Sequence, residues 1–190
     1  MLENRFYLAI IGILAIAVYS NSLGNDFLSD DIPGILENPI IDKWEIFLTN
    51  PLGFFGILPK FIIANIFGKV PWAFRTVNIL FHIENCFLIY FLADILLNKR
   101  IALVTALLAS SHPILTESIT WIAGGGYAQY TFFILLGISL YLLSVKKERL
   151  YYASLISFLI ALLTSEKAMA FPFILVSLHL SYPKLLNKKI

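Results

Sequence analysis

Two adjacent carboxylates, Asp30 and Asp31, are the residues of this 190-residue chain best suited to chemistry. They lie in segment 24–41, the first polar stretch after an apolar N-terminal run. An acidic pair in a loop is often only a solvated turn, with an aspartate capping the residues that follow. The alternative is a general base or a ligand for a hard divalent cation, because adjacent carboxylates repel each other and favour a cation between them.

A second group of polar side chains follows the spacing of a helix. Residues 72–97 form an apolar run, and Arg75, Asn78, His82 and Asn85 occur within it at i, i+3, i+7 and i+10. This spacing predicts one polar stripe along a helix. Because lipid exposure of such a stripe would be costly, it must face other helices or a wet cavity. Hydrogen bonding between helices and a functional role are both open for His82 and the asparagines.

Two further polar groups occur between apolar runs. His112 precedes a proline and Glu117, a pattern that fits either a site or an interfacial helix. The glycines at 124–126 permit close approach of a ligand or backbone, or form a flexible turn. Glu166 and Lys167 form a charged pair that fits a solvated hairpin, although Lys167 could also bind phosphate as a point charge.

The composition requires a membrane environment for these residues. The chain is 59% hydrophobic and only 14% charged, with a mean hydropathy of +0.82. These values exclude an ordinary soluble domain, which needs more polar surface to cover its core. Basic residues occur singly or in short clusters at the ends of apolar runs rather than in a patch, so a nucleic-acid partner is not expected. Cys86 is the single cysteine and cannot form an intramolecular disulfide.

We expect an all-α integral membrane protein with one membrane domain, residues 1–190. The first outer loop spans 24–72 and contains five prolines, with an interfacial or re-entrant helix expected at 54–67. The second and third outer loops are 112–126 and 164–167. About six transmembrane helices are predicted, at residues 6–23, 72–97, 101–111, 127–145, 150–163 and 168–182.

Basic residues predict the orientation. If the N-terminus is cytoplasmic, nine of the 14 basic residues lie inside, including a basic tail from Lys184 to Lys189. Both termini are then cytoplasmic, and every unusual polar loop is outside. Short loops favour a prokaryotic plasma membrane. The nine inner residues are Arg5, Lys99, Arg100, Lys146, Lys147, Arg149, Lys184, Lys188 and Lys189.

Several blocks, taken in order, resemble the C-type glycosyltransferase superfamily. They are most similar to the multi-spanning O-mannosyltransferase branch that includes the transmembrane proteins with tetratricopeptide repeats. The resembling residues are Asn25-Asp26-Phe27 with Asp30-Asp31 and Asn38-Pro39; Asn78, His82 and Asn85; His112-Pro113, Glu117 and Trp121-Ile122-Ala123-Gly124; and Ser165-Glu166 with Pro172.

The resemblance implies an integral-membrane transferase that uses a sugar linked to polyprenyl phosphate as donor. Asp30 or Asp31 would act as base toward an acceptor hydroxyl. Further roles follow from the side of the membrane and the charge of each residue. Arg75, His112 and Lys167 would bind the donor phosphate, and Asn78, His82, Glu117 and Glu166 would order the pocket. No cofactor is certain, and a divalent cation would be held by Asp30 and Asp31.

The chain also departs from this family in two ways. Relatives often carry Gly-Arg-x-Asp after the Trp-Ile-Ala block, whereas this chain has Gly124-Gly125-Gly126-Tyr127. Relatives are also much longer. The competing hypothesis is therefore a non-catalytic membrane scaffold or subunit that keeps the fold, with membrane lipid and a second membrane subunit supplying further spans as partners.

Overall fold

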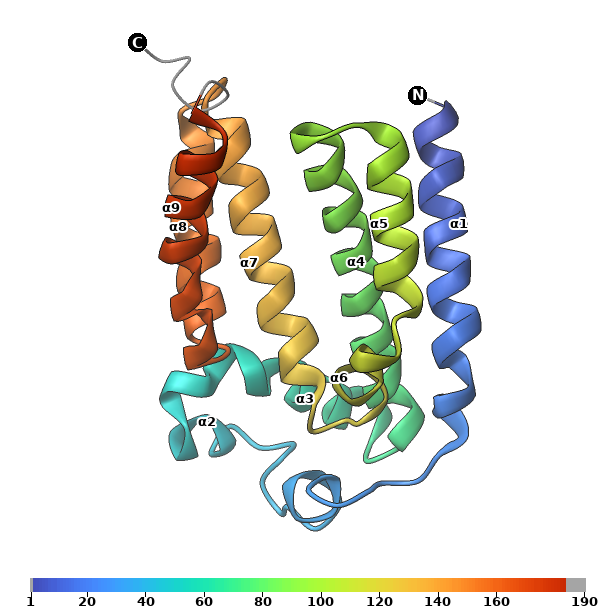
Figure 1. The fold of residues 1–190 in the computed structure, drawn as a ribbon. Coiled ribbons are helices and arrows are strands. Elements are labelled where there is room, and N and C mark those ends of the chain that lie inside the picture. The colour runs from blue at the N-terminus through green and yellow to red at the C-terminus, as the bar shows by residue number, and fades with distance from the viewer. Residues whose placement is uncertain (1, 184–190) are drawn as a thin grey trace.

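The computed structural model describes residues 2–183, and every regular element in that range is helical. Six helices stand side by side as a bundle, and the shorter helices gather at one end of it (Figure 1). The bundle helices are α1 (Leu2–Tyr19), α4 (Pro71–Leu96), α5 (Lys99–Ser111), α7 (Gly125–Ser144), α8 (Arg149–Leu162) and α9 (Phe171–Ser181). The shorter helices are α2 (Ile46–Thr49), α3 (Phe54–Phe67) and α6 (Thr116–Thr120). Short 3₁₀ or π turns cover Ser20–Gly24, Ile32–Leu36, Pro51–Gly53, Pro113–Leu115 and Glu166–Ala170.

Within residues 2–183, three helices are long and apolar enough by themselves to cross a membrane. They are Glu3–Gly24, Pro71–Leu96 and Gly125–Ser144. Helix α8 has 14 residues and α9 has 11, both shorter than the roughly 20 residues that a bilayer core requires. The basic tail from Lys184 to Lys189 lies outside the described residues.

A fourth crossing is formed if α5 and the helical residues after it count as one span. Lys99–Ser111 and Pro113–Thr120 together are long enough, but they meet at an angle of 49°. The bend has a local cause, because a proline pushes the residue before it out of the helical region. His112 is accordingly extended, with φ −70° and ψ 125°.

Helix α3 lies across one end of the bundle (Figure 1). Pro59 in its middle has no N–H, so the carbonyl of Phe55 loses its intrahelical donor. The side-chain amide of Gln129 on α7 donates to that carbonyl instead. The N–H of Phe55 also donates to the carbonyl of Leu163, at 3.2 Å, just after α8. The hydrogen bonds of Phe55, one of them to the carbonyl that Pro59 leaves unpaired, therefore attach α3 to the bundle.

Two apolar clusters hold the bundle together. One joins α1, α4 and α5 and includes Cys86, which is fully buried. The other joins α4, through Leu92, to α7, α8 and α9, where Phe171 stacks on Phe158 with 4.8 Å between ring centroids. A Cβ at Gly137 of α7 would come within 2.9 Å of the Phe171 ring, so the glycine allows this close packing.

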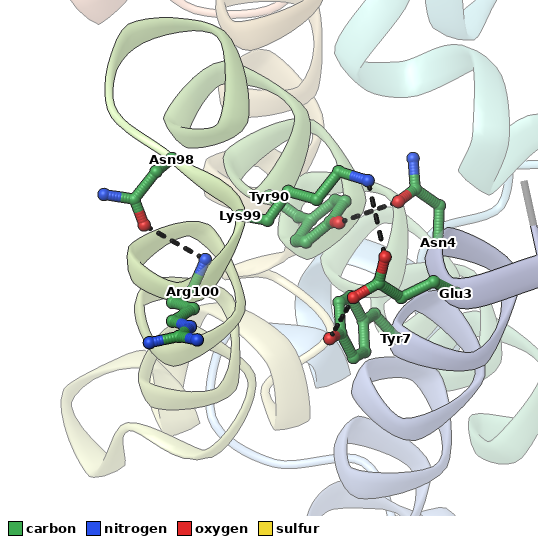
Figure 2. Close-up of polar contacts among 7 residues, drawn as sticks. All are labelled: Glu3, Asn4, Tyr7, Tyr90, Asn98, Lys99 and Arg100. Carbon is green, nitrogen blue, oxygen red and sulfur yellow. Dashed lines mark hydrogen bonds and ion pairs between the residues drawn. The ribbon is translucent and has the colours of Figure 1, made fainter.

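The opposite end of the bundle carries a small polar cluster between α1 and the start of α5 (Figure 2). Lys99 Nζ lies 3.6 Å from Glu3 Oε2, and the Tyr7 hydroxyl donates to Glu3 at 2.8 Å. Asn98 caps α5, since its Oδ1 accepts from the N–H groups of Arg100 and the next residue, both at 3.1 Å. The ion pair is exposed, and such pairs contribute little to stability.

Candidate functional site

The acidic pair divides into one buried and one exposed carboxylate. Asp31 has no exposed surface, and its two oxygens accept from the N–H of Ala123, at 2.7 Å, and of Leu28, at 3.2 Å. Asp30 is exposed, and its carboxylate contacts the Ser29 hydroxyl at 3.4 Å. Ser29 has a left-handed backbone with φ 51°, which turns the chain just before the pair. Asp31 thus fixes the loop to the segment before α7, while Asp30 faces outward.

Arg75 fastens the beginning of the same loop. Its side chain is 2% exposed and donates to three backbone carbonyls. Nε donates to Thr120 at 2.9 Å, Nη2 donates to Asp26 at 2.5 Å, and Nη1 donates to Asn25. A planar guanidinium has enough fixed donors to join several carbonyls in this way. Arg75 therefore connects α4, the first loop and the end of α6.

Asn78, one turn further along α4, holds the segment that Asp31 also contacts. Its Nδ2 donates to the carbonyl of Trp121 at 3.2 Å, and the Trp121 indole N–H donates to Leu28 at 3.3 Å. The Asn78 amide packs directly on Gly125, where an added Cβ would overlap it. Glycine is thus required at 125 by close approach. Asp31 of the first loop and Asn78 of α4 therefore both hold the segment 121–125 in place.

The rest of the polar stripe faces neighbouring helices, and all four of its residues are buried. His82 Nε2 lies 3.4 Å from the carbonyl of Ser110 on α5, and Asn85 donates to the carbonyl of Ala128 on α7 at 2.8 Å. The Asn85 Oδ1 is the buried side-chain oxygen that finds no partner within residues 2–183. A groove of about 440 Å³ runs over this part of α4 between α6 and α7, and Glu117 lines it.

The predicted phosphate ligands lie apart from one another. His112 is exposed, and its Nδ1 accepts from the N–H of Ile114 at 3.2 Å. Lys167 is exposed and donates to the Tyr127 hydroxyl at 2.8 Å, with its ammonium 4.1 Å from the centre of that ring. This hydrogen bond raises the pKa of Lys167. Glu166 is also exposed.

Asp31, Arg75 and Asn78 therefore converge on residues 120–125, whereas the other predicted residues do not. His82 and Glu117 lie along the groove on the other side of α7. Glu166 and Lys167 lie in the turn between α8 and α9.

Sequence reasoning missed Lys60 as a site residue. Lys60 lies on α3 and lines a small cavity with Asn78, Gly125 and Gly126. Burial lowers the pKa of Lys60, and the negative charge of Asp31 opposes that shift. A single lysine inside an apolar helix was the available signal, since burying a charged group is costly unless it has a partner.

The acidic pair offers few ligands for a metal ion. Within residues 2–183, no three side chains from His, Cys, Asp and Glu are grouped to hold one. Both oxygens of Asp31 already accept backbone hydrogen bonds, which leaves Asp30 as the accessible carboxylate. A hard cation usually takes several oxygen ligands, so this arrangement does not fit a protein-held divalent cation.

Comparison with protein families identifies the region from α3 to the C-terminus. Residues 57–190 match the model of the dolichyl-phosphate-mannose-protein mannosyltransferase family. The resemblance inferred from the sequence is confirmed at this level. The match does not include Asp30 and Asp31, so their proposed role depends on geometry.

The curated proteins similar to this chain include protein O-mannosyl-transferases. Human protein O-mannosyl-transferase TMTC1 is 32% identical over 127 residues, which cover 56% of this chain and 14% of the relative. The mouse TMTC1 protein is 29% identical over 126 residues, with 56% of this chain and 13% of the relative covered. Human TMTC2 is 28% identical over 147 residues, covering 68% of this chain and 18% of the relative. The chain thus aligns with less than a fifth of these relatives, and no solved structure matches it significantly.

Proposed function

The chain belongs to the dolichyl-phosphate-mannose-protein mannosyltransferase family, and on that premise we propose that it is the catalytic module of a membrane glycosyltransferase. The module transfers a sugar, mannose by analogy with its named relatives, from a polyprenyl-phosphate donor to an acceptor hydroxyl. The acceptor proposed from the same names is a serine or threonine of a protein.

One observation carries this proposal: Asp31 Oδ1 accepts from the N–H of Ala123 at 2.7 Å. This contact joins residues 92 positions apart and places the acidic turn beside the N-terminus of α7. Because α7 lies within residues 57–190, the contact brings the acidic pair beside the part of the chain that matches the family.

The exposed carboxylate, Asp30, is the better base, and Asp31 is the residue that positions it. Asp30 accepts the proton of the acceptor hydroxyl, and the acceptor oxygen forms a bond to C1 of the sugar. The bond from C1 to the phosphate oxygen breaks, and its electron pair leaves with the polyprenyl phosphate. Positive groups near that oxygen lower the barrier by stabilising the charge that develops on it.

The three cations predicted from sequence take different roles in this proposal. All the donors of Arg75 that the structure pairs go to backbone carbonyls, so Arg75 acts by positioning the loop. His112 and Lys167 are exposed and remain accessible to a phosphate from the outside. Asn78 orders residues 121–125, while His82, Glu117 and Glu166 order the surroundings.

We further propose that all six bundle helices cross the membrane, with both termini cytoplasmic and the site outside. The start of α1 and the end of α9 lie at the same end of the bundle, and α2, α3 and α6 lie at the other (Figure 1). Helices α8 and α9 pack along α7, so a locally thinned bilayer would let these short helices span it.

A scaffold subunit is the second candidate, and one observation favours it. Asp31 is fully buried and its oxygens are occupied, which is what a structural aspartate needs. In that case the chain would bind a second membrane subunit, and Asp30 would have no chemical role.

The two candidates are separated by sugar transfer in proteoliposomes that contain the chain, a polyprenyl-phosphate mannose and a threonine-containing peptide. The Asp30→Asn variant should lose at least about a hundredfold in rate, since a general base contributes roughly that much. A matched control is Asp42→Asn, an exposed aspartate of the same loop. Equal rates for wild type and Asp30→Asn would rule out the assignment of Asp30 as base, and absence of transfer by the wild type would favour the scaffold.

A further inference from the structure

Lys60 is a partly buried cation at the edge of a small cavity. It lies in the middle of α3 and lines the cavity between α3, α4 and α7. Within residues 2–183, no carbonyl or side chain accepts a hydrogen bond from its ammonium, and no carboxylate lies within ion-pair distance. Its other neighbours in the cavity with polar side chains, Asn78 and Gln129, are neutral. Leaving a cation in such a place is unfavourable unless an anion joins it.

The N-terminus of α7 faces the same cavity. Gly125 and Gly126 form the first turn of this 20-residue helix, and both line the cavity. The first turn of a helix carries unpaired N–H groups and a partial positive charge. In α7 the N–H groups of Gly125 and Tyr127 already donate to the carbonyls of Ile122, at 3.1 Å, and Gly124, at 2.9 Å. The N–H of Gly126 donates to no group within residues 2–183, and nothing lies within 4 Å of the position a Cβ would take there. Two positive groups therefore meet at one opening, an arrangement that favours an anion.

The shape of the cavity limits which part of an anion can enter it. Its volume is about 20 Å³, which holds one water-sized group. One oxygen of a tetrahedral phosphate fits the enclosed part, with the remaining oxygens at the mouth. No Asp or Glu among the described residues 2–183 lines the cavity, although the negative charge of Asp31 acts on Lys60.

The position of α3 favours an anion that is carried by a lipid. Ile62 and Ile66 are exposed on the side of α3 away from the bundle, 44% and 66% respectively. An apolar helix that is exposed in this way at the end of the bundle lies at the level of lipid headgroups. The cavity is thus within reach of a phosphate attached to a membrane lipid.

We propose that Lys60 and the N-terminal turn of α7 bind the phosphate group of a membrane-anchored phosphate ester. That this ester is the polyprenyl-phosphate donor rests on the proposed function. The phosphate would then lie on the side of α7 where Asp31 is attached, so that the leaving oxygen and the acidic turn share one site.

The test measures binding of radiolabelled decaprenyl phosphate to the chain in phosphatidylcholine nanodiscs. Lys60→Met should weaken binding by about tenfold or more, the loss expected for one charge-assisted hydrogen bond. Lys60→Arg should bind within about threefold of wild type because the positive charge is kept. Lys43→Met, which removes an exposed lysine of the same loop, should bind as wild type. Thermal unfolding of each variant checks folding, and removing an unpaired desolvated charge should not lower the unfolding temperature.

Equal binding by wild type and Lys60→Met overturns the site. Competition then identifies the source of the phosphate. Displacement by phosphatidylglycerol or inorganic phosphate as readily as by unlabelled decaprenyl phosphate overturns the assignment to the donor, and preference for decaprenyl phosphate supports it. Sugar transfer by Asp30→Asn tests the proposed function separately, since unchanged transfer contradicts that function and leaves the binding result for Lys60 standing.

Discussion

The two sides of the α7 N-terminus each carry a lysine, and the two lysines are held in opposite ways. Lys167 is exposed and donates to the Tyr127 hydroxyl, and that hydrogen bond raises its pKa. Lys60 is partly buried, has no acceptor within residues 2–183, and has a pKa lowered by desolvation. The more accessible lysine is therefore not the one that most needs an anion. An exposed ammonium is already satisfied by water and a phenol, whereas a desolvated one is stabilised only by a ligand.

The surroundings of the two lysines also differ in how deeply they are buried. The Lys60 side is assembled from buried contacts, namely Asp31 with Ala123 and Asn78 with Gly125. The Lys167 side is a single exposed contact. Substitutions that break these buried contacts should therefore lower the stability of the chain, and substitutions at the Lys167–Tyr127 contact should change it little.

The largest effect is expected for Asp31→Ala. This change leaves the N–H groups of Ala123 and Leu28 without their acceptor, and an unpaired buried donor costs about 1–3 kcal/mol. We expect a loss of about 3 kcal/mol, which lowers the unfolding temperature by roughly 6 °C or more for a chain of this size. Thermal unfolding in detergent measures it, with the exposed neighbour Asp30→Ala as matched control. Equal stability of the two variants would contradict the buried role of Asp31.

Gly125→Ala should have the next largest effect. A methyl group there would overlap the Asn78 amide, which must move and release its hydrogen bond to Trp121. Overpacking of this kind costs about 2 kcal/mol. The control is Gly126→Ala in the same turn, where an added Cβ meets nothing within 4 Å. Gly126→Ala should unfold at the wild-type temperature or slightly above it, and a loss as large as that of Gly125→Ala would show that the contact with Asn78 is unimportant.

The pH dependence of phosphate binding tests the Lys60 side directly. Because burial lowers the pKa of Lys60, this lysine loses its proton at a lower pH than an ordinary lysine. Below that lowered pKa the ammonium is charged and binds phosphate, and above it the amine is neutral. Asp31 is the acidic group that acts on Lys60, and it opposes the shift.

Binding of decaprenyl phosphate should therefore fall by about tenfold as the pH rises through the lowered pKa of Lys60. The fall should begin before the ordinary lysine range is reached. Lys60→Arg should remove it, because a guanidinium keeps its proton throughout. An identical alkaline fall in wild type and Lys60→Arg would assign the titration to another group.

Helical periodicity predicted the part of the site that lies on α4. The spacing of Arg75, Asn78, His82 and Asn85 indicated one face, and all four side chains are buried against other elements. The bend before Pro113 also follows from local rules, since it depends on one residue pair. The six apolar runs each became a helix, but α8 and α9 are too short to count as spans by length.

The contacts across the first loop had no such local signal. Asp31 meets Ala123, and Arg75 meets Asn25, through backbone groups that any residue carries. Composition and spacing therefore could not separate the buried Asp31 from the exposed Asp30. Lys60 was predictable in principle, because it is a lone charge in an apolar helix. Its cavity was not predictable, because it depends on the hydrogen bond between Gln129 of α7 and the Phe55 carbonyl, which Pro59 leaves without an intrahelical donor.

The smallest effect is expected on the Lys167 side, for Tyr127→Phe. The ring remains under the ammonium and only the phenol oxygen is removed, so the hydrogen bond that raises the pKa of Lys167 is lost. Water replaces that oxygen because the contact is exposed, and exposed polar contacts of this kind contribute little. Binding of decaprenyl phosphate should change by less than about twofold, whereas Lys60→Met loses about tenfold under the same conditions. If Tyr127→Phe weakened binding as strongly as Lys60→Met, the phosphate would have to lie on the Lys167 side of α7, and the comparison between the two lysines would be reversed.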